Sequence, residues 1–323
     1  MSVKDITKEE IRQIIADKTG SLNIPRNFGI ITDTSDFFKV EYNDVLILGD
    51  KMFWVKSCEK EGRFGLDDEP KFWVRRATDL SDGSTKILKM VFHEEFETKV
   101  GGVVIKCFRS PKKEGRILDL VANHKNFMHG YWINDAAGNN IRILDFIYGP
   151  RFDNVVMQYG SSHEDYFHNY FPDVLNQYIE LVEAIKFLHD HGEKHGDIRR
   201  DHILFDREAG VNRWIDFDYN YLHGEAKWSF DLQGLGNIII YLTGRGDVLV
   251  PELYHTQREL YDSLWGEDLN ISYKNRVANL KKIYPYIPDS LNRVLLHFSF
   301  GARIFYDSTG QMLDDLVKAR ADL

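Results

Sequence analysis

The hydrophobic period of this chain changes near residue 160, and that change limits the folds open to it. Before it, KMFWVKS (51–57), KFWVRRA (71–77) and KILKMVF (86–92) are rich in β-branched and aromatic residues and are separated by turn-like segments. After it, residues 172–191 place apolar side chains at helical spacing and end before a glycine. The pattern predicts an α+β chain with two lobes, an antiparallel sheet first and mainly helices second.

A helix is also expected inside the strand-rich part, over residues 111–122, and another near the start, over residues 5–18. Two further strands, 141–149 and 154–160, lead towards the helical part. These elements predict three segments: an N-terminal extension (1–45), a sheet lobe (46–160) and a helical lobe (161–323).

Composition excludes several classes of protein. The 323 residues carry a net charge of −9, so general nucleic-acid binding is not expected. The charged N-terminus lacks the apolar core of a signal peptide, and no apolar stretch is long enough to cross a bilayer. Cys58 and Cys107 cannot build a disulfide framework, which favours a reducing compartment and a cytoplasmic location.

Two carboxylates stand out beside short strand-like runs. HGDIRRDHILFD (195–206) follows the long helix, and WIDFD (214–218) follows a turn, so a hairpin would bring Asp197 and Asp216 together. Two carboxylates that converge repel each other unless a cation or a proton lies between them. Phosphoryl transfer with a metal nucleotide uses such a pair, one carboxylate for the acceptor hydroxyl and one for the metal.

With these motifs the chain resembles the protein-kinase-like superfamily over roughly residues 45–318. Asp197 matches the catalytic-loop Asp, and Asp216 matches the metal-binding Asp of the Asp-Phe-Gly motif. Lys89 resembles the strand lysine that holds the α and β phosphates, and Glu114 resembles the helix glutamate that pairs with it. Lys86 competes for the lysine role, although side chains three apart on a strand face opposite ways. The resemblance implies ATP as a ligand with Mg²⁺, or alternatively Mn²⁺.

The resemblance also implies residues around the nucleotide. A reduced glycine-rich loop keeps two glycines that let the backbone approach phosphates, with an ordinary hairpin turn as the alternative. A strand that enters the hinge supplies a gatekeeper and backbone groups for adenine. Asp231 resembles the helix residue that braces the catalytic loop. The nucleotide-binding residues so predicted are Gly62 and Gly65 in the loop, and Met157, Gln158, Tyr159 and Gly160 at the hinge.

The metal-binding residues depart from the family pattern. His202 stands where a second metal ligand, Asn, is usual, and imidazole suits Mg²⁺ less well than oxygen ligands. It is therefore either a metal ligand or a histidine bound to a backbone carbonyl. Asp218 replaces the motif glycine, which predicts a less mobile segment because Asp adopts positive φ less readily.

The acceptor-binding residues depart as well. Arg199 falls where Ser/Thr kinases carry a lysine, and it either neutralises the transferred phosphoryl group or forms a surface salt bridge. Gly196 gives a His-Gly-Asp sequence similar to that of aminoglycoside and choline kinases. Only 15 positions separate Asp216 from Asp231, so the segment that docks peptides is short.

The sequence thus predicts an ATP-dependent phosphotransferase of a bilobal, protein-kinase-like fold, foremost a protein Ser/Thr kinase-like enzyme. Asp197 and Arg199 are its predicted catalytic residues, and Asp216 and His202 its predicted metal ligands. The acceptor is a hydroxyl of a protein or of a small molecule, and a small-molecule kinase is one alternative. A second is a catalytically impaired pseudokinase that binds nucleotide or a protein partner.

Overall fold

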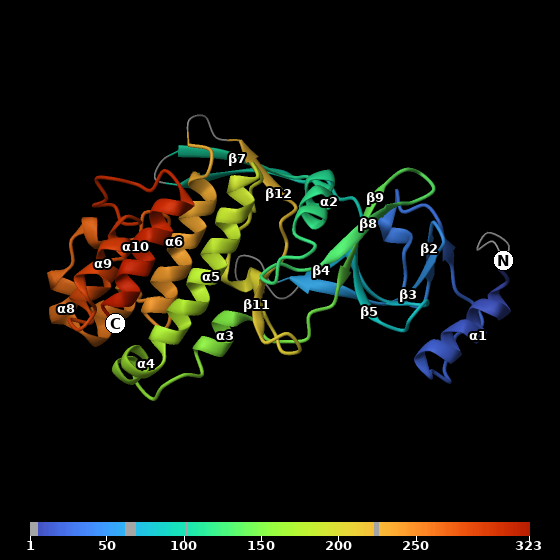
Figure 1. Cartoon of the computed structure of the whole chain (residues 1–323), viewed down its shortest axis with the longest axis horizontal. Coiled ribbons are helices and arrows are strands. Elements are labelled where there is room, and N and C mark those ends of the chain that lie inside the picture. Colours follow the sequence, from blue (N-terminus) through green and yellow to red (C-terminus); the bar gives the residue numbers. More distant parts are fainter. Residues whose placement is uncertain (1–5, 62–68, 101–102, 223–225) are drawn as a thin grey trace. The chain divides into compact units, whose positions relative to one another are not determined.

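The computed structural model describes residues 6–61, 69–100, 103–222 and 226–323. Within these ranges the chain is α+β, with ten α-helices and a curled, mixed sheet of seven strands (Figure 1). It divides into two compact units. The first unit comprises Met1–His93, Ser110–Asn123 and Met128–Phe146, and the second comprises Glu94–Arg109, His124–Phe127 and Ile147–Leu323. These units do not coincide with the three predicted segments.

The first unit contains the seven-stranded sheet. Its strands are β1 (Ile30–Ile31), β2 (Val45–Leu48), β3 (Lys51–Glu61), β4 (Glu69–Asp79), β5 (Thr85–Lys89), β8 (Gly130–Asn134) and β9 (Asn140–Asp145). They lie in the order β1-β2-β3-β4-β5-β9-β8. Every neighbouring pair is antiparallel except β1 with β2, so the predicted antiparallel sheet is confirmed for all but its first edge.

Two helices belong to this unit, α1 (Lys8–Thr19) and α2 (Pro111–Leu120), and both were predicted. Helix α1 begins at a capping box in which Thr7 and Glu10 satisfy each other's backbone N–H groups. Its buried Ile11 and Ile15 pack with Val45 of β2 and Trp54 of β3. Helix α1 is therefore part of this unit's core.

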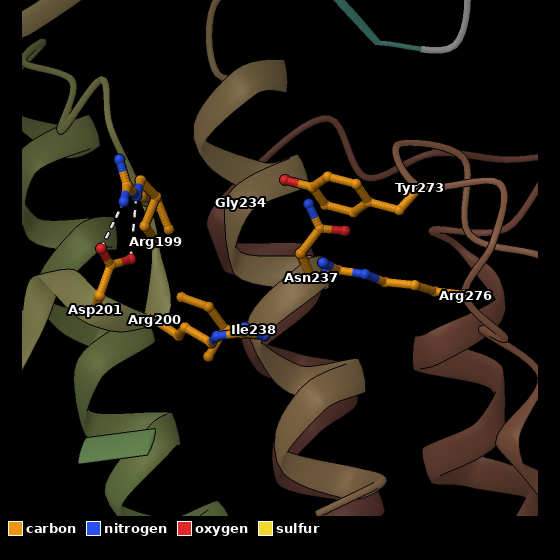
Figure 2. A pocket seen from close by; sticks show the side chains of 9 residues that line it. Arg199, Arg200, Asp201, Gly234, Asn237, Ile238, Tyr273 and Arg276 are labelled. Atoms are coloured by element: carbon orange, nitrogen blue, oxygen red, sulfur yellow. Dashed lines mark hydrogen bonds and ion pairs between the residues drawn. The ribbon is translucent and has the colours of Figure 1, made fainter. Parts of the chain in front are cut away.

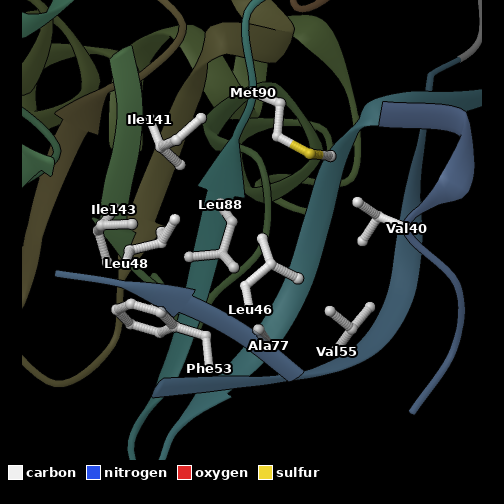
Figure 3. Packing of buried hydrophobic residues seen from close by; sticks show 10 residues of the cluster. All are labelled: Val40, Leu46, Leu48, Phe53, Val55, Ala77, Leu88, Met90, Ile141 and Ile143. Atoms are coloured by element: carbon white, nitrogen blue, oxygen red, sulfur yellow. The ribbon is translucent and has the colours of Figure 1, made fainter. Parts of the chain in front are cut away.

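The core of the first unit lies on one face of the sheet. Alternate residues of a strand point to one face, which collects apolar side chains from β2, β3, β4, β5 and β9 (Figure 3). The cluster contains Val40, Leu46, Leu48, Phe53, Val55, Ala77, Leu88, Met90, Ile141 and Ile143. This packing fixes the register of β5 against β9, which positions the charged residues discussed below.

The second unit contains most of the helices and two small sheets. The helices are α3 (Phe152–Val156), α4 (His163–Asn169), α5 (Phe171–Asp190), α6 (Ser229–Thr243), α7 (Val250–Thr256), α8 (Arg258–Ser263), α9 (Asp289–Leu296) and α10 (Thr309–Ala321). Strands β10 (Ile203–Asp206) and β11 (Val211–Trp214) form the predicted hairpin. Strands β6 (Glu95–Val100), β7 (Val103–Arg109) and β12 (Tyr219–Leu222) form the other sheet, in the order β12-β7-β6. Among the described residues no helix is long and apolar enough to span a membrane.

One predicted strand is wrong. Residues 152–156 form helix α3, and Met157 to Tyr159 continue as a turn. The helix buries Phe152 and Val156, which lie four residues apart on one face. Burial of that face outweighs the strand preference of two adjacent valines, because β-propensity is weak compared with tertiary packing.

Candidate functional site

A buried ion-pair cluster joins β5, β9 and α2 in the first unit. Lys89 and Arg142 are directly opposed partners on β5 and β9. Glu114 reaches them from the first turn of α2, with one carboxylate oxygen 2.8 Å from Lys89 Nζ and the other 3.0 Å from Arg142 Nε. The side chains of Lys89, Glu114 and Arg142 are 2%, 0% and 1% exposed, respectively. The predicted pairing of Lys89 with Glu114 is confirmed.

The same strand shows why Lys86 is not equivalent. Its Nζ lies 2.6 Å from Asp145, its cross-strand partner, and that carboxylate is 52% exposed. Lys86 and Lys89 thus face opposite sides of the sheet, as their spacing requires. Arg142 was missed in the sequence. The signal that points to it is a cation in an otherwise apolar strand, IRIL, where burial demands a partner.

In the second unit, His202 lies between two carboxylates. Its Nδ1 donates to the carbonyl oxygen of Asp197 at 2.9 Å and is 3.6 Å from the Asp197 carboxylate. Its Nε2 is 3.8 Å from the carboxylate of Asp216. The β10–β11 hairpin therefore brings Asp197 and Asp216 near each other, as the sequence predicted, and the His202 imidazole between them was not predicted.

The environment changes the acidity of Asp197. Burial raises the pKa of its carboxyl above the ordinary value. Electrostatic interaction with His202 and Arg199 opposes the rise, whereas the nearby Asp216 adds to it. Asp216 itself adopts φ 61°, a left-handed conformation that is rare outside glycine and is concentrated at functional sites.

The hydrogen bond of His202 agrees with both of its predicted roles. A carbonyl oxygen only accepts, so Nδ1 carries the proton, and a neutral ring then keeps a lone pair on Nε2. A backbone carbonyl on Nδ1 is also the usual way to orient a metal-binding histidine. No group of three or more metal-binding side chains occurs among the described residues.

The loop that contains Asp197 is held by Asp231, as predicted. Its carboxylate is fully buried and accepts the backbone N–H of His195 at 2.8 Å and of Gly196 at 2.9 Å. His189 Nε2 lies 3.0 Å away. Burial pushes the pKa of Asp231 upward, but the hydrogen bond and charge of His189 outweigh it, with help from the other donors, and the pKa falls below its ordinary value.

Arg199 forms a bidentate ion pair with Asp201, in which Nε and Nη2 donate to the two carboxylate oxygens at 3.0 Å and 2.5 Å (Figure 2). Of the two predicted roles, this geometry corresponds to the salt bridge. The pair lies two residues after Asp197, and the arginine side chain remains 35% exposed.

Asp218 has a partner that the sequence did not reveal. Arg109, at the end of β7, donates to both of its carboxylate oxygens at 2.8 Å and 3.0 Å, and both side chains are almost fully buried. Arg109 also lies 4.1 Å from the ring of Tyr219 and 2.9 Å from Glu94. The segment after Asp216 is therefore held in the three-stranded sheet. No local pattern signals this pair, since 109 positions separate its members.

The residues predicted to bind adenine lie in the turn after α3. Met157 is 45% exposed, and Gly160 has φ 72°. The carbonyl oxygens of Met157 and Gly160 accept Arg245 Nη2 at 3.3 Å and 2.7 Å. Gln158 and Tyr159 belong to the same turn. The predicted loop residues Gly62 and Gly65 lie outside the described residues.

A scan against protein-family models found no match, and a search of curated proteins found none either.

The predicted residues that contact one another form two groups, each within one unit. Lys89 lies with Glu114 in the first unit, and Asp197 lies with His202 and Asp216 in the second.

Proposed function

We propose that this chain is an ATP-dependent phosphotransferase that moves the γ-phosphoryl group of ATP to a hydroxyl acceptor. The observation that carries the proposal is the buried pair of Lys89 and Glu114. An ion pair between a strand lysine and a helix glutamate is the element that positions nucleotide phosphates in kinases. The antiparallel order β3-β4-β5-β9-β8, with α2 following β5 and β7 in the chain, supports a kinase-like arrangement.

Asp197 is the proposed base. Its raised pKa brings its proton affinity closer to that needed to accept the proton of an attacking hydroxyl. Asp231 holds the backbone of the preceding two residues, which fixes where the carboxylate of Asp197 stands. Arg199 must exchange part of its pairing with Asp201 if it is to contact the moving phosphoryl group.

Asp216 is the proposed Mg²⁺ ligand, with His202 Nε2 as a second donor that suits Mn²⁺ better. Mg²⁺ is usually bound by one or two carboxylates together with substrate phosphates, so the present donors fit it. The ion, when bound, neutralises negative charge on the phosphates.

We place the protein in the cytoplasm, because Cys58 and Cys107 are both free thiols.

A specific observation favours a second candidate, a pseudokinase. His202 occupies the position between Asp197 and Asp216, 3.6 Å and 3.8 Å from their carboxylates, so its imidazole lies where a metal would otherwise bridge them. In that case the chain binds nucleotide or a protein partner without turnover. A protein Ser/Thr acceptor and a small-molecule acceptor both remain consistent with the first candidate.

The first test is calorimetric titration with ATP, in Mg²⁺ and separately in Mn²⁺. Wild type should bind saturably and Lys89→Ala should bind at least tenfold more weakly, because a charged phosphate contact is lost. Lys86→Ala is the matched control, since it removes a lysine from the same strand on its other face. If the folded wild-type protein binds ATP neither with Mg²⁺ nor with Mn²⁺, the proposal is refuted.

Turnover separates the two candidates. The release of phosphate from ATP, with water as acceptor, should be measurable in wild type and should fall by at least about a hundredfold in Asp197→Asn. Saturable ATP binding without any turnover in wild type selects the pseudokinase. Equal turnover in wild type and Asp197→Asn refutes the role given to Asp197.

A further inference from the structure

A pocket of about 170 Å³ lies beside the catalytic loop, entirely within the second unit (Figure 2). Three segments line it: the chain after Asp197, helix α6, and the segment that follows α8. The lining residues are Ile198, Arg199, Arg200, Asp201, Gly234, Asn237, Ile238, Tyr273 and Arg276. Three of them are arginines and only one is acidic, in a chain whose net charge is −9.

One carboxylate holds two of these arginines in place. Asp247 accepts a hydrogen bond from Arg200 Nη1 on one oxygen at 3.0 Å, and its other oxygen forms an ion pair with Arg276 Nη1 at 3.1 Å. Each guanidinium also lies on an aromatic ring, Arg200 at 4.2 Å from Tyr241 and Arg276 at 4.1 Å from Tyr273. Stacking and pairing together leave each planar group in one orientation.

The guanidiniums of Arg200 and Arg276 carry more N–H donors than the acceptors that their contacts supply. The Arg276 guanidinium has five N–H donors and one ion-pair partner, Asp247, and its Nε is buried without a hydrogen-bond partner in the described chain. Arg200 adds only a longer contact to Asp153, 3.5 Å, and that carboxylate already pairs with Arg151. A buried donor without a partner in a native protein calls for an explanation, and a bound oxyanion provides one.

The pocket also lies close to the proposed base. Ile198 lines it and directly follows Asp197, so the Cα atoms of these two residues are about 3.8 Å apart. Its volume suits a small group rather than a folded partner. This adjacency motivates an acceptor whose anionic group binds Arg200 and Arg276 while a hydroxyl of the same small molecule reaches Asp197.

We propose that this pocket binds the phosphate group of a small, hydroxyl-bearing phosphomonoester, which is the acceptor substrate. The inference rests on the proposed phosphotransferase function. The acceptor oxygen forms a bond to the γ-phosphorus, and the bond from that phosphorus to the oxygen of the leaving ADP breaks. The hydroxyl proton passes to the carboxylate of Asp197. Arg200 and Arg276 recognise the acceptor and take no part in the bond changes.

Equilibrium binding tests the site without turnover. The probes are inorganic phosphate, glycerol 3-phosphate and glycerol, titrated into wild type, Arg276→Ala and Lys274→Ala. Lys274 is an exposed cation two residues away and serves as the matched control. Both phosphates should bind saturably to wild type and to Lys274→Ala. Their affinity for Arg276→Ala should be lower by roughly tenfold or more, and glycerol should not bind to any of the three proteins.

Further arms separate this site from the nucleotide site. Phosphate binding must persist in Lys89→Ala, and ATP binding must persist in Arg276→Ala. Phosphate binding that is absent, or that is unaffected by Arg276→Ala, overturns the inference while ATP binding stands. Phosphate binding that needs Arg276, in a chain that does not bind ATP, overturns the acceptor role together with the proposed function. A phosphoserine peptide that binds more tightly than glycerol 3-phosphate overturns the small acceptor.

Discussion

Replacing Glu114 with alanine tests whether the buried cluster of the first unit holds that unit together. Glu114 is the carboxylate between Lys89 and Arg142, which face each other on neighbouring strands. Like charges directly opposed on a sheet repel, and here both are 2% exposed or less. Without Glu114 the two cations stay buried and lose the anion that they share.

The size of the effect follows from these contacts. Removing one partner of a buried ion pair costs about 3–5 kcal/mol, because the remaining charge stays desolvated. Arg142 retains two carbonyl acceptors, Asn140 at 2.7 Å and Met90 at 3.2 Å. The loss for Glu114→Ala should therefore lie towards the lower end of that range, at about 3 kcal/mol.

Urea unfolding measures this loss. With a slope of about 2 kcal/mol per molar urea, the midpoint should fall by about 1.5 M. The control is Asp145→Asn, which strips Lys86 of its partner on the same two strands. That carboxylate is 52% exposed, so the control should lose less than about 1 kcal/mol. If both variants lose the same small amount, the cluster is not desolvated and the reasoning is wrong.

Three further predictions concern the second unit and the turns. Because the pKa of Asp231 is lower in the folded than in the unfolded chain, its contribution to stability is present above about pH 3.9 and lost as pH falls through the folded value. Urea midpoints of wild type and Asp231→Asn should therefore differ at pH 7 and converge in acid, and a constant difference would contradict this. Arg109→Met removes the cation that pairs with the buried Asp218 and should cost about 3–5 kcal/mol, much of it recovered when Asp218→Leu is added; purely additive losses argue against the pair. Gly160→Ala should cost about 1–3 kcal/mol and more than Gly138→Ala, because both have positive φ but only the former places a Cβ 2.8 Å from a backbone nitrogen; equal costs rule out the clash.

Much of the fold follows from local periodicity. Helix α5 and strands β3 to β5 are long, strongly patterned segments, and the structure has them close to where the sequence places them. The short segment 154–160 shows the limit of this reasoning. Two adjacent valines favour a strand locally, yet Phe152 and Val156 are buried together on α3, and such packing is visible only in the folded chain.

The sequence by itself determined the α+β class, the pairing of Lys89 with Glu114, the hairpin between Asp197 and Asp216, and the bracing role of Asp231. The class and the hairpin follow from the hydrophobic period, which is local. The Lys89–Glu114 pairing and the bracing by Asp231 are what the resemblance to the protein-kinase-like superfamily implied, from motifs in their order along the chain.

Only the tertiary structure decided where the remaining charges go. Arg142 joins the lysine and glutamate across a strand pair, and Arg109 meets Asp218 across 109 positions. Arg200 and Arg276 meet on Asp247 to shape the proposed anion pocket. The sequence around an arginine does not indicate which distant carboxylate its side chain will pair with. The pairing is selected by burial, where an unpaired charge is too costly to keep.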